Sequence, residues 1–256
     1  MRGELVLSTS TLLGFLMTLA RVAGIFVFVP IPGMSSKSSS ARIALSLSMA
    51  MALFPYWPKP SGEVSGGLLA GWLISEAALG IGIGLCVAFV LEGLYLAGQI
   101  MGLQAGYAYA STIDPSTSAD SGVLVVFAEM AGGLMFFALG LDREVVRMFV
   151  RSMELAPAGA FTLARGAGAQ LLLTGGMIFS TGMRLALPVV AVLLLIDVSL
   201  ALLGRVNAQL QLLSVAFPVK MLVALVIMGW LLLLLPVVLQ NGATTAFAAA
   251  RSLVTR

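Results

Sequence analysis

Long apolar stretches make up most of this chain, and they restrict the folds that it can adopt. Hydrophobic residues account for 60% of the 256 residues, charged residues for only 10%, and the mean hydropathy is +1.07. A soluble domain has about 25% charged residues, and a helix of about 20 apolar residues spans a bilayer. The composition therefore predicts an all-α, polytopic membrane protein.

Proline residues and short polar links divide the apolar sequence into six expected helical segments. The segments cover residues 5–29, 42–54, 68–91, 123–141, 171–203 and 210–239. We expect the third segment to continue through 94–109 as a bent or broken helix. Pro188, Pro218 and the Gly175-Gly176 pair favour bends in the last two segments. The chain is thus expected to form one helical domain over residues 1–256, built of long, bent hairpins.

The positive charges leave the membrane topology open. Lys37 and Arg42 favour a cytoplasmic first link, because basic loops stay inside. Residues 142–168 carry four arginines, and the tail from 240 to 256 has an amphipathic pattern. If 68–112 crosses the membrane once, the 142–168 stretch lies outside. If it crosses twice, that stretch and the tail both lie inside, which fits the charge rule better. A hairpin that never crosses would give the same pattern.

A polar segment interrupts the apolar pattern in the middle of the chain. Residues 106–122 read GYAYASTIDPSTSADSG. Small residues, tyrosines and an Asp-Pro pair make a poor helix. Non-helical backbone is tolerated at membrane depth only where protein or a water-filled cavity surrounds it. This segment is therefore the first candidate for a gate, a plug or a binding site.

Seven ionisable side chains lie inside the apolar segments, where each costs roughly 2.5–3.5 kcal/mol on insertion scales. They are Arg21, Glu76, Glu92, Glu129, Arg184, Asp197 and Lys220. One interpretation is a proton or ion relay. The other is a set of ion pairs or hydrogen bonds between helices or subunits, and we favour it because the charges are single, dispersed and of both signs.

The sequence argues against an enzyme, a cofactor site, a metal site and a nucleic-acid site. It contains no histidine and one cysteine, Cys86, and its net charge is only +3 with no basic patch. Gly98, Gly102 and Gly106 form a small-xxx-small pattern that permits close helix packing. That pattern fits subunit assembly and packing within the chain equally well.

Three stretches together resemble the FliR family of flagellar biosynthetic proteins, whose injectisome relatives form the type III secretion export apparatus. They are residues 99–115 (QIMGLQAGYAYASTIDP), 187–205 (LPVVAVLLLIDVSLALLGR) and 209–220 (QLQLLSVAFPVK). The resemblance covers essentially the whole chain, and the order and spacing of the motifs make it specific.

The resemblance implies a subunit of a hetero-oligomeric export gate. The expected partners are FliP-like and FliQ-like subunits, other export-apparatus membrane proteins of the basal body, unfolded protein substrates and the lipid of the bacterial inner membrane. The gate would conduct unfolded substrates, and a flagellar system is favoured over an injectisome by overall likeness. The six charges Arg21, Glu76, Glu129, Arg184, Asp197 and Lys220 would serve assembly or gating.

The resemblance also assigns a role to the polar segment. The loop at 106–119 resembles a plug that closes the channel. Gly106 would begin it, Tyr107, Tyr109 and Ile113 would supply its apolar contacts, and Asp114-Pro115 would fix its turn.

A proton-coupled secondary transporter is the alternative. The break at 106–122 would then be the substrate site, and Glu76, Glu129 or Asp197 would carry protons. This alternative predicts inverted repeats, which the sequence does not show.

Overall fold

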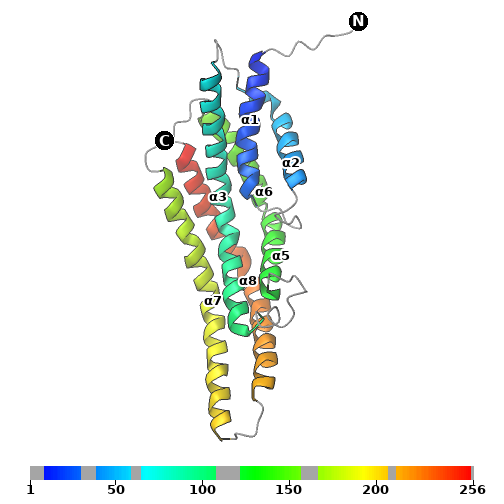
Figure 1. The fold of residues 1–256 in the computed structure, drawn as a ribbon, viewed down its shortest axis with the longest axis vertical. Coiled ribbons are helices and arrows are strands. Elements are labelled where there is room, and N and C mark those ends of the chain that lie inside the picture. The colour runs from blue at the N-terminus through cyan, green and yellow to red at the C-terminus, as the bar shows by residue number, and fades with distance from the viewer. Residues whose placement is uncertain are drawn as a thin grey trace. The chain divides into compact units, whose positions relative to one another are not determined.

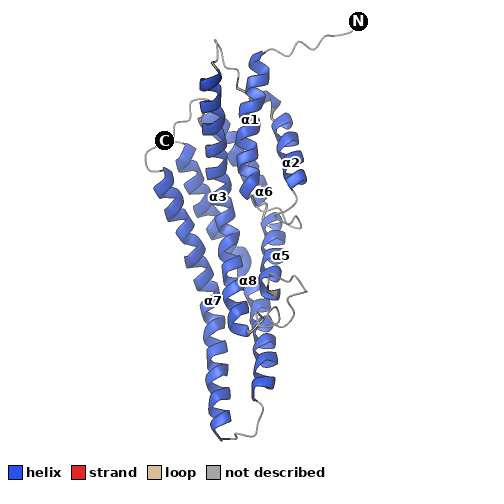
Figure 2. Ribbon diagram, in the orientation of Figure 1, coloured by secondary structure: helices blue, strands red, loops and turns tan. Residues whose placement is uncertain are grey.

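The computed structural model describes residues 9–29, 39–58, 65–107, 122–156, 167–206 and 212–254, and within them the regular structure is entirely helical (Figure 2). The all-α prediction is therefore confirmed. The elements are α1 (Thr9–Phe28), α2 (Ser39–Ala52), a short 3-10 turn (Phe54–Tyr56), α3 (Gly66–Ala105), α5 (Val123–Ala138), α6 (Leu141–Leu155), α7 (Ala167–Val206) and α8 (Leu212–Val254) (Figure 1).

The later helices are longer than the sequence predicted. α3 runs for 40 residues without the expected break. α7 also has 40 residues and continues through Pro188, and α8 has 43 residues and continues through Pro218 and Pro236 into the tail. A proline is tolerated inside an apolar helix when neighbouring groups satisfy the freed backbone carbonyl. Pro236 therefore did not mark the end of α8.

The charged stretch after residue 140 forms a helix that is not among the six expected segments. α5 ends at a left-handed glycine, Gly140, with φ of +68°, and this conformation closes a helix. Asp142 and Glu144 then lie in the first turn of α6, where acidic side chains offset the positive end of the helix dipole. The four-arginine stretch thus begins as an amphipathic helix.

Four of the described helices are long and apolar enough to cross a membrane. They are α1, α3, α7 and α8, and the count rises to five if α5 and α6 together form one broken span. α2 is apolar but has only 14 residues, fewer than a span requires. The prediction of a polytopic helical membrane protein is thus confirmed, with fewer spans than the six expected segments.

The chain divides into two compact units. Unit 1 comprises residues 1–89, 140–175 and 243–256, and unit 2 comprises 90–139 and 176–242. α3, α7 and α8 each contribute a segment to both units. The expectation of one domain over residues 1–256 stays a prediction.

In unit 1, α1 and α3 approach closely enough for their backbones to touch. A Cβ atom on Gly24 would lie 2.6 Å from the carbonyl oxygen of Ala77, and one on Gly84 would lie 2.6 Å from that of Ile25. A Cβ on Gly80 would meet the backbone of Arg21. Gly80 and Gly84, four residues apart, thus form the small-residue face on which α1 packs.

The residues after α2 attach to α1 in the same unit. The Trp57 ring lies 5.0 Å from that of Phe15 on α1, measured between centroids. Its indole Nε1–H donates to the carbonyl oxygen of Ala50 at 2.8 Å. These contacts fix the chain where it leaves the α1–α2 hairpin.

Unit 2 also uses glycines at its helix crossings. A Cβ on Gly98 would lie 3.0 Å from the carbonyl oxygen of Leu124 on α5, and one on Gly182 would lie 3.1 Å from the carbonyl oxygen of Gly93. Gly98 therefore packs within the chain. Packing within the chain and subunit assembly were the two interpretations of the Gly98–Gly102–Gly106 pattern.

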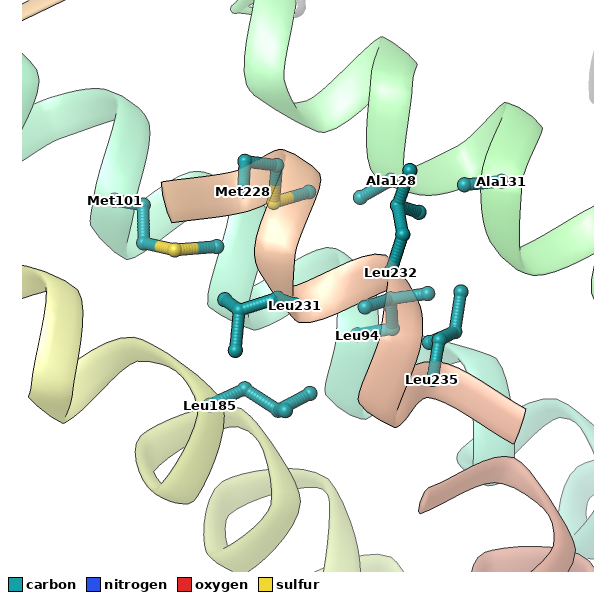
Figure 3. A pocket seen from close by; sticks show the side chains of 9 residues that line it. All are labelled: Leu94, Met101, Ala128, Ala131, Leu185, Met228, Leu231, Leu232 and Leu235. Atoms are coloured by element: carbon teal, nitrogen blue, oxygen red, sulfur yellow. The ribbon is translucent and has the colours of Figure 1, made fainter. Parts of the chain in front are cut away.

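The centre of unit 2 is apolar. A small cavity of about 10 Å³, room for about one water, lies among side chains of α3, α5, α7 and α8. Met101 lines it and is fully buried, and Leu185 and Leu231 point toward one another across it (Figure 3). Methionine fills such irregular gaps well.

We predict that Gly80→Val destabilises the fold and that Gly71→Val does not. A side chain at Gly80 would press on the α1 backbone, whereas nothing lies within 4 Å of a Cβ at Gly71 on the same helix. Overpacking of this kind costs about 1–3 kcal/mol. Thermal unfolding of both variants in mild detergent checks this, and equal melting temperatures would contradict the close α1–α3 contact.

Candidate functional site

Arg21 is the centre of a buried polar cluster in unit 1. Its side chain and that of Glu76 are both 0% exposed, and Arg21 Nε donates to Glu76 Oε2 at 2.5 Å. Nη1 donates to the carbonyl oxygen and to Oγ of Ser152, at 2.8 and 3.2 Å. Nη2 donates to the carbonyl oxygen of Ala156 at 2.9 Å. One guanidinium therefore ties α1 to α3 and to the end of α6.

The contacts to α6 complete a helix terminus. The last four carbonyl groups of an α-helix have no partner within the helix, and α6 ends at Leu155. Arg21 reaches two carbonyls at this end: that of Ser152, which also accepts from the N–H of Ala156, and that of Ala156 itself. A cation there also opposes the negative end of the helix dipole. The cluster is built to position three helices.

A second ion pair lies in unit 2. Lys220 Nζ lies 3.0 Å from both carboxylate oxygens of Asp197, and Gln104 Nε2 donates to Asp197 Oδ2 at 3.3 Å. The Lys220 side chain is 11% exposed and that of Asp197 is 40% exposed. Together with Gln104, the pair joins the end of α3 to α7 and α8, and the Asp197 side of the pair is partly exposed.

Gly106 and Tyr107 form the root of the predicted loop, two residues beyond the polar contact of Gln104. Gly106 has φ of +91°, its N–H donates to the carbonyl of Leu103 at 3.2 Å, and the N–H of Tyr107 donates to that of Gly102 at 3.0 Å. This pattern is a Schellman motif, which ends a helix at glycine. The left-handed backbone strains any other residue at Gly106.

The loop root also contacts α8 within unit 2. A Cβ on Gly106 would lie 2.7 Å from the Phe217 ring, and the Tyr107 hydroxyl donates to the carbonyl oxygen of Met221 at 3.1 Å. Burial raises the pKa of the Tyr107 phenol, so the hydroxyl stays a donor. Tyr109, Ile113, Asp114 and Pro115 lie outside the described residues.

The remaining charges are not brought into either cluster. Glu92, Glu129 and Arg184 are exposed on the surface of this chain, and no ion pair joins them to a described residue. Glu92 and Glu129 face each other closely enough to repel. Among the described residues, no group of three or more His, Cys, Asp or Glu side chains is placed to hold a metal ion.

The family follows from comparison of the whole chain. A family model described as bacterial export proteins, family 1, matches residues 12–246. The chain belongs to this family. The resemblance drawn from the three sequence motifs is thereby confirmed.

Individual members of the export protein family are similar over most of the chain. A flagellar biosynthetic protein FliR from Pectobacterium carotovorum is 31% identical over 64% of this chain and 63% of the relative. The FliR of Escherichia coli is 30% identical over 63% and 62%, so the chain matches just under two thirds of these relatives' length. The surface presentation of antigens protein SpaR from Salmonella typhimurium is 28% identical over 95% and 89%.

The pairings within this export protein were not predicted from its sequence. Arg21 and Glu76 are 55 positions apart, and the sequence carries no signal that joins them. The contacts of Arg21 with backbone carbonyls could not be predicted from residue types, because every residue has a backbone carbonyl. Gly106 did carry a signal, because a glycine directly after an apolar helical run marks a helix end.

We predict that Arg21→Gln and Glu76→Gln each lower the free energy of unfolding by about 3–5 kcal/mol, because each strands a buried polar partner. The double variant Arg21→Met/Glu76→Met should be less destabilised than the sum. Arg147→Gln is the matched control, since Arg147 is 74% exposed and, among the described residues, forms an ion pair only with Glu144 on the surface. Thermal unfolding in detergent measures all four. Equal melting temperatures for Arg21→Gln and the Arg147→Gln control would contradict the structural role assigned to the cluster.

Proposed function

We propose that this chain is a structural subunit of the flagellar type III protein export gate, where it helps to form a channel for unfolded substrates across the bacterial inner membrane. Membership of the bacterial export family over residues 12–246 carries the proposal. The flagellar system is proposed because two relatives named as flagellar biosynthetic proteins, at 31% and 30% identity, exceed the 28% of SpaR.

The exposed apolar surface supports an assembly. The most apolar windows of α7 and α8 are only 22% buried within the chain. Leu172, Trp230 and Leu233 are 79%, 76% and 79% exposed. Surfaces of this kind need a cover of lipid or of other subunits. We propose FliP-like and FliQ-like subunits as the cover, together with other membrane proteins of the basal body.

The exposed charges fit the same proposal. Glu129 and Arg184 project from apolar helices, and lipid alone would make both expensive. Opposite charges on partner subunits would remove that cost. The Asp197–Lys220 pair belongs to the unit that holds the loop root, so we assign it to gating and the buried Arg21–Glu76 pair to assembly.

The loop that begins at Gly106 is proposed as the plug of the closed channel. Its root is fixed by the hydrogen bond from the Tyr107 hydroxyl to Met221 on α8 and by the glycine turn, so the loop starts from a defined point. Tyr107, Tyr109 and Ile113 would supply the apolar seal, and Asp114-Pro115 the turn. Such a seal has to be weak enough for an arriving substrate to displace.

The transporter alternative has less support. Glu76 and Asp197, two of its three candidate proton carriers, each have a cationic partner at 2.5 and 3.0 Å. Each of these carboxylates is therefore engaged in a contact between helices. No described contact links the two pairs into a relay.

We predict that a tagged copy of this chain co-purifies with the FliP-like and FliQ-like proteins of its own organism after gentle extraction. Glu129→Lys should weaken that complex, because it reverses a charge assigned to the partner contact. Arg147→Glu is the matched charge reversal on the exposed face of α6 and should leave the complex intact. A monodisperse protein without partners would contradict the export-gate proposal.

We predict that deletion of Tyr107–Thr117 raises ion leak through the assembled complex without preventing assembly. Tyr107→Phe should give a smaller leak, since it removes only the hydrogen bond to Met221. Conductance of membranes that contain the purified complex measures both. Unchanged conductance in an assembled complex would refute the plug.

A further inference from the structure

An open groove lies between α1 and α2 in unit 1. The two helices lie side by side (Figure 1). The groove has a volume of about 430 Å³, within the range of roughly 300–1,000 Å³ that small-molecule sites occupy. Its walls include Leu19, Ala23 and Phe26 from α1 and Arg42, Ile43 and Leu47 from α2.

The groove has one charged end and apolar sides. Arg42 lies in the first turn of α2, and its Nη1 donates to the carbonyl oxygen of Val27 near the end of α1. The walls continue from there toward Leu19 on α1 and Leu47 on α2, and those side chains are apolar. Ser46 does not add a free polar group, because its hydroxyl donates to the carbonyl oxygen of Arg42 at 2.8 Å. The pattern is that of an amphiphile, with a polar head and an apolar tail.

The guanidinium at the charged end has an unused donor. Arg42 Nε is buried and has no hydrogen-bond partner in the described part of the chain. A buried donor without an acceptor is destabilising. An anion at this end of the groove would pair with the guanidinium as a whole, whose Nη1 alone has an acceptor among the described residues. Arginine suits phosphate because its planar fork presents several donors at once.

The combination of one charged end with apolar sides suits a lipid, which carries both an anionic head and an apolar tail. A free phosphate would use the Arg42 end and leave the apolar sides uncovered.

We infer that this groove binds an anionic phospholipid, with its phosphate on Arg42 and an acyl chain along α1 and α2. Basic pockets between membrane helices hold such headgroups in the same way. The inference does not depend on the export-gate proposal, since it uses only unit 1 and a membrane environment. The lipid would complete the α1–α2 hairpin by pairing a phosphate with the Arg42 guanidinium and covering exposed Ile43 and Leu47.

The test is native mass spectrometry of the full chain in mild detergent, titrated with phosphatidylglycerol and, separately, with phosphatidylcholine of the same acyl chains. The first phosphatidylglycerol should bind about fivefold more tightly, as expected for one basic residue. Arg42→Gln should weaken phosphatidylglycerol binding more than phosphatidylcholine binding, because the choline charge already offsets the phosphate in the latter, and so abolish that preference. Arg147→Gln, an exposed arginine outside the groove, should keep the preference.

A second variant tests the apolar part and does not alter Arg42. Ala23→Phe should fill the groove and remove the tight site for both lipids, and its melting temperature reports whether it folds. Inorganic phosphate should not displace the bound phosphatidylglycerol.

Three results would overturn the inference. They are equal affinity for the two lipids in the wild type, displacement by inorganic phosphate, and an unchanged preference in both Arg42→Gln and Ala23→Phe. Loss of co-purifying protein subunits in Arg42→Gln with unchanged lipid binding would mean that a protein covers the groove. It would overturn the inference while leaving the export-gate proposal in place.

Discussion

The Arg21 guanidinium has five N–H donors, so its complete burial requires several acceptors. Unit 1 supplies them from three places in the chain: a carboxylate on α3, a hydroxyl on α6 and two backbone carbonyls at the α6 end. Each acceptor is in place only when its helix is in place. If any one of these helices packed differently, a buried charge or a helix terminus would lose its partner. The free-energy cost of that loss exceeds the stabilisation that the intact ion pair provides. The cluster thus selects one arrangement of unit 1.

The glycines of α1 and α3 make that arrangement sterically possible. Gly24 and Gly80 bring the two backbones together beside Arg21 and Glu76. With larger residues the helices would stand farther apart, and the short Nε–Oε2 contact would not form. Close packing and ion pairing therefore depend on each other in unit 1. Unit 2 has the same glycine crossings, but its ion pair is partly open.

The helical class and the membrane character could be predicted from composition, because the scarcity of charge leaves few alternatives. The end of α3 before Gly106 could also be predicted, since a glycine after an apolar run is a local signal for a helix end. The expected segment 171–203 already included Pro188, but the extension of α8 through Pro236 to Val254 was not predicted, because tolerance of proline depends on surrounding helices. The pairing of Arg21 with Glu76 and of Asp197 with Lys220 is a product of tertiary packing, and one sequence contains no local trace of it.

The different surroundings of the two ion pairs bear on how an export gate would work. A fully buried pair such as Arg21–Glu76 cannot open without exposing charge to an apolar interior, so it is suited to a part that stays fixed. Asp197 is 40% exposed, and water is able to replace Lys220 at lower cost. The more exposed pair is the one joined through Gln104 to the end of α3, two residues before the loop root. If the loop moves when a substrate arrives, the adjustable contact lies next to it and the rigid cluster lies in the other unit.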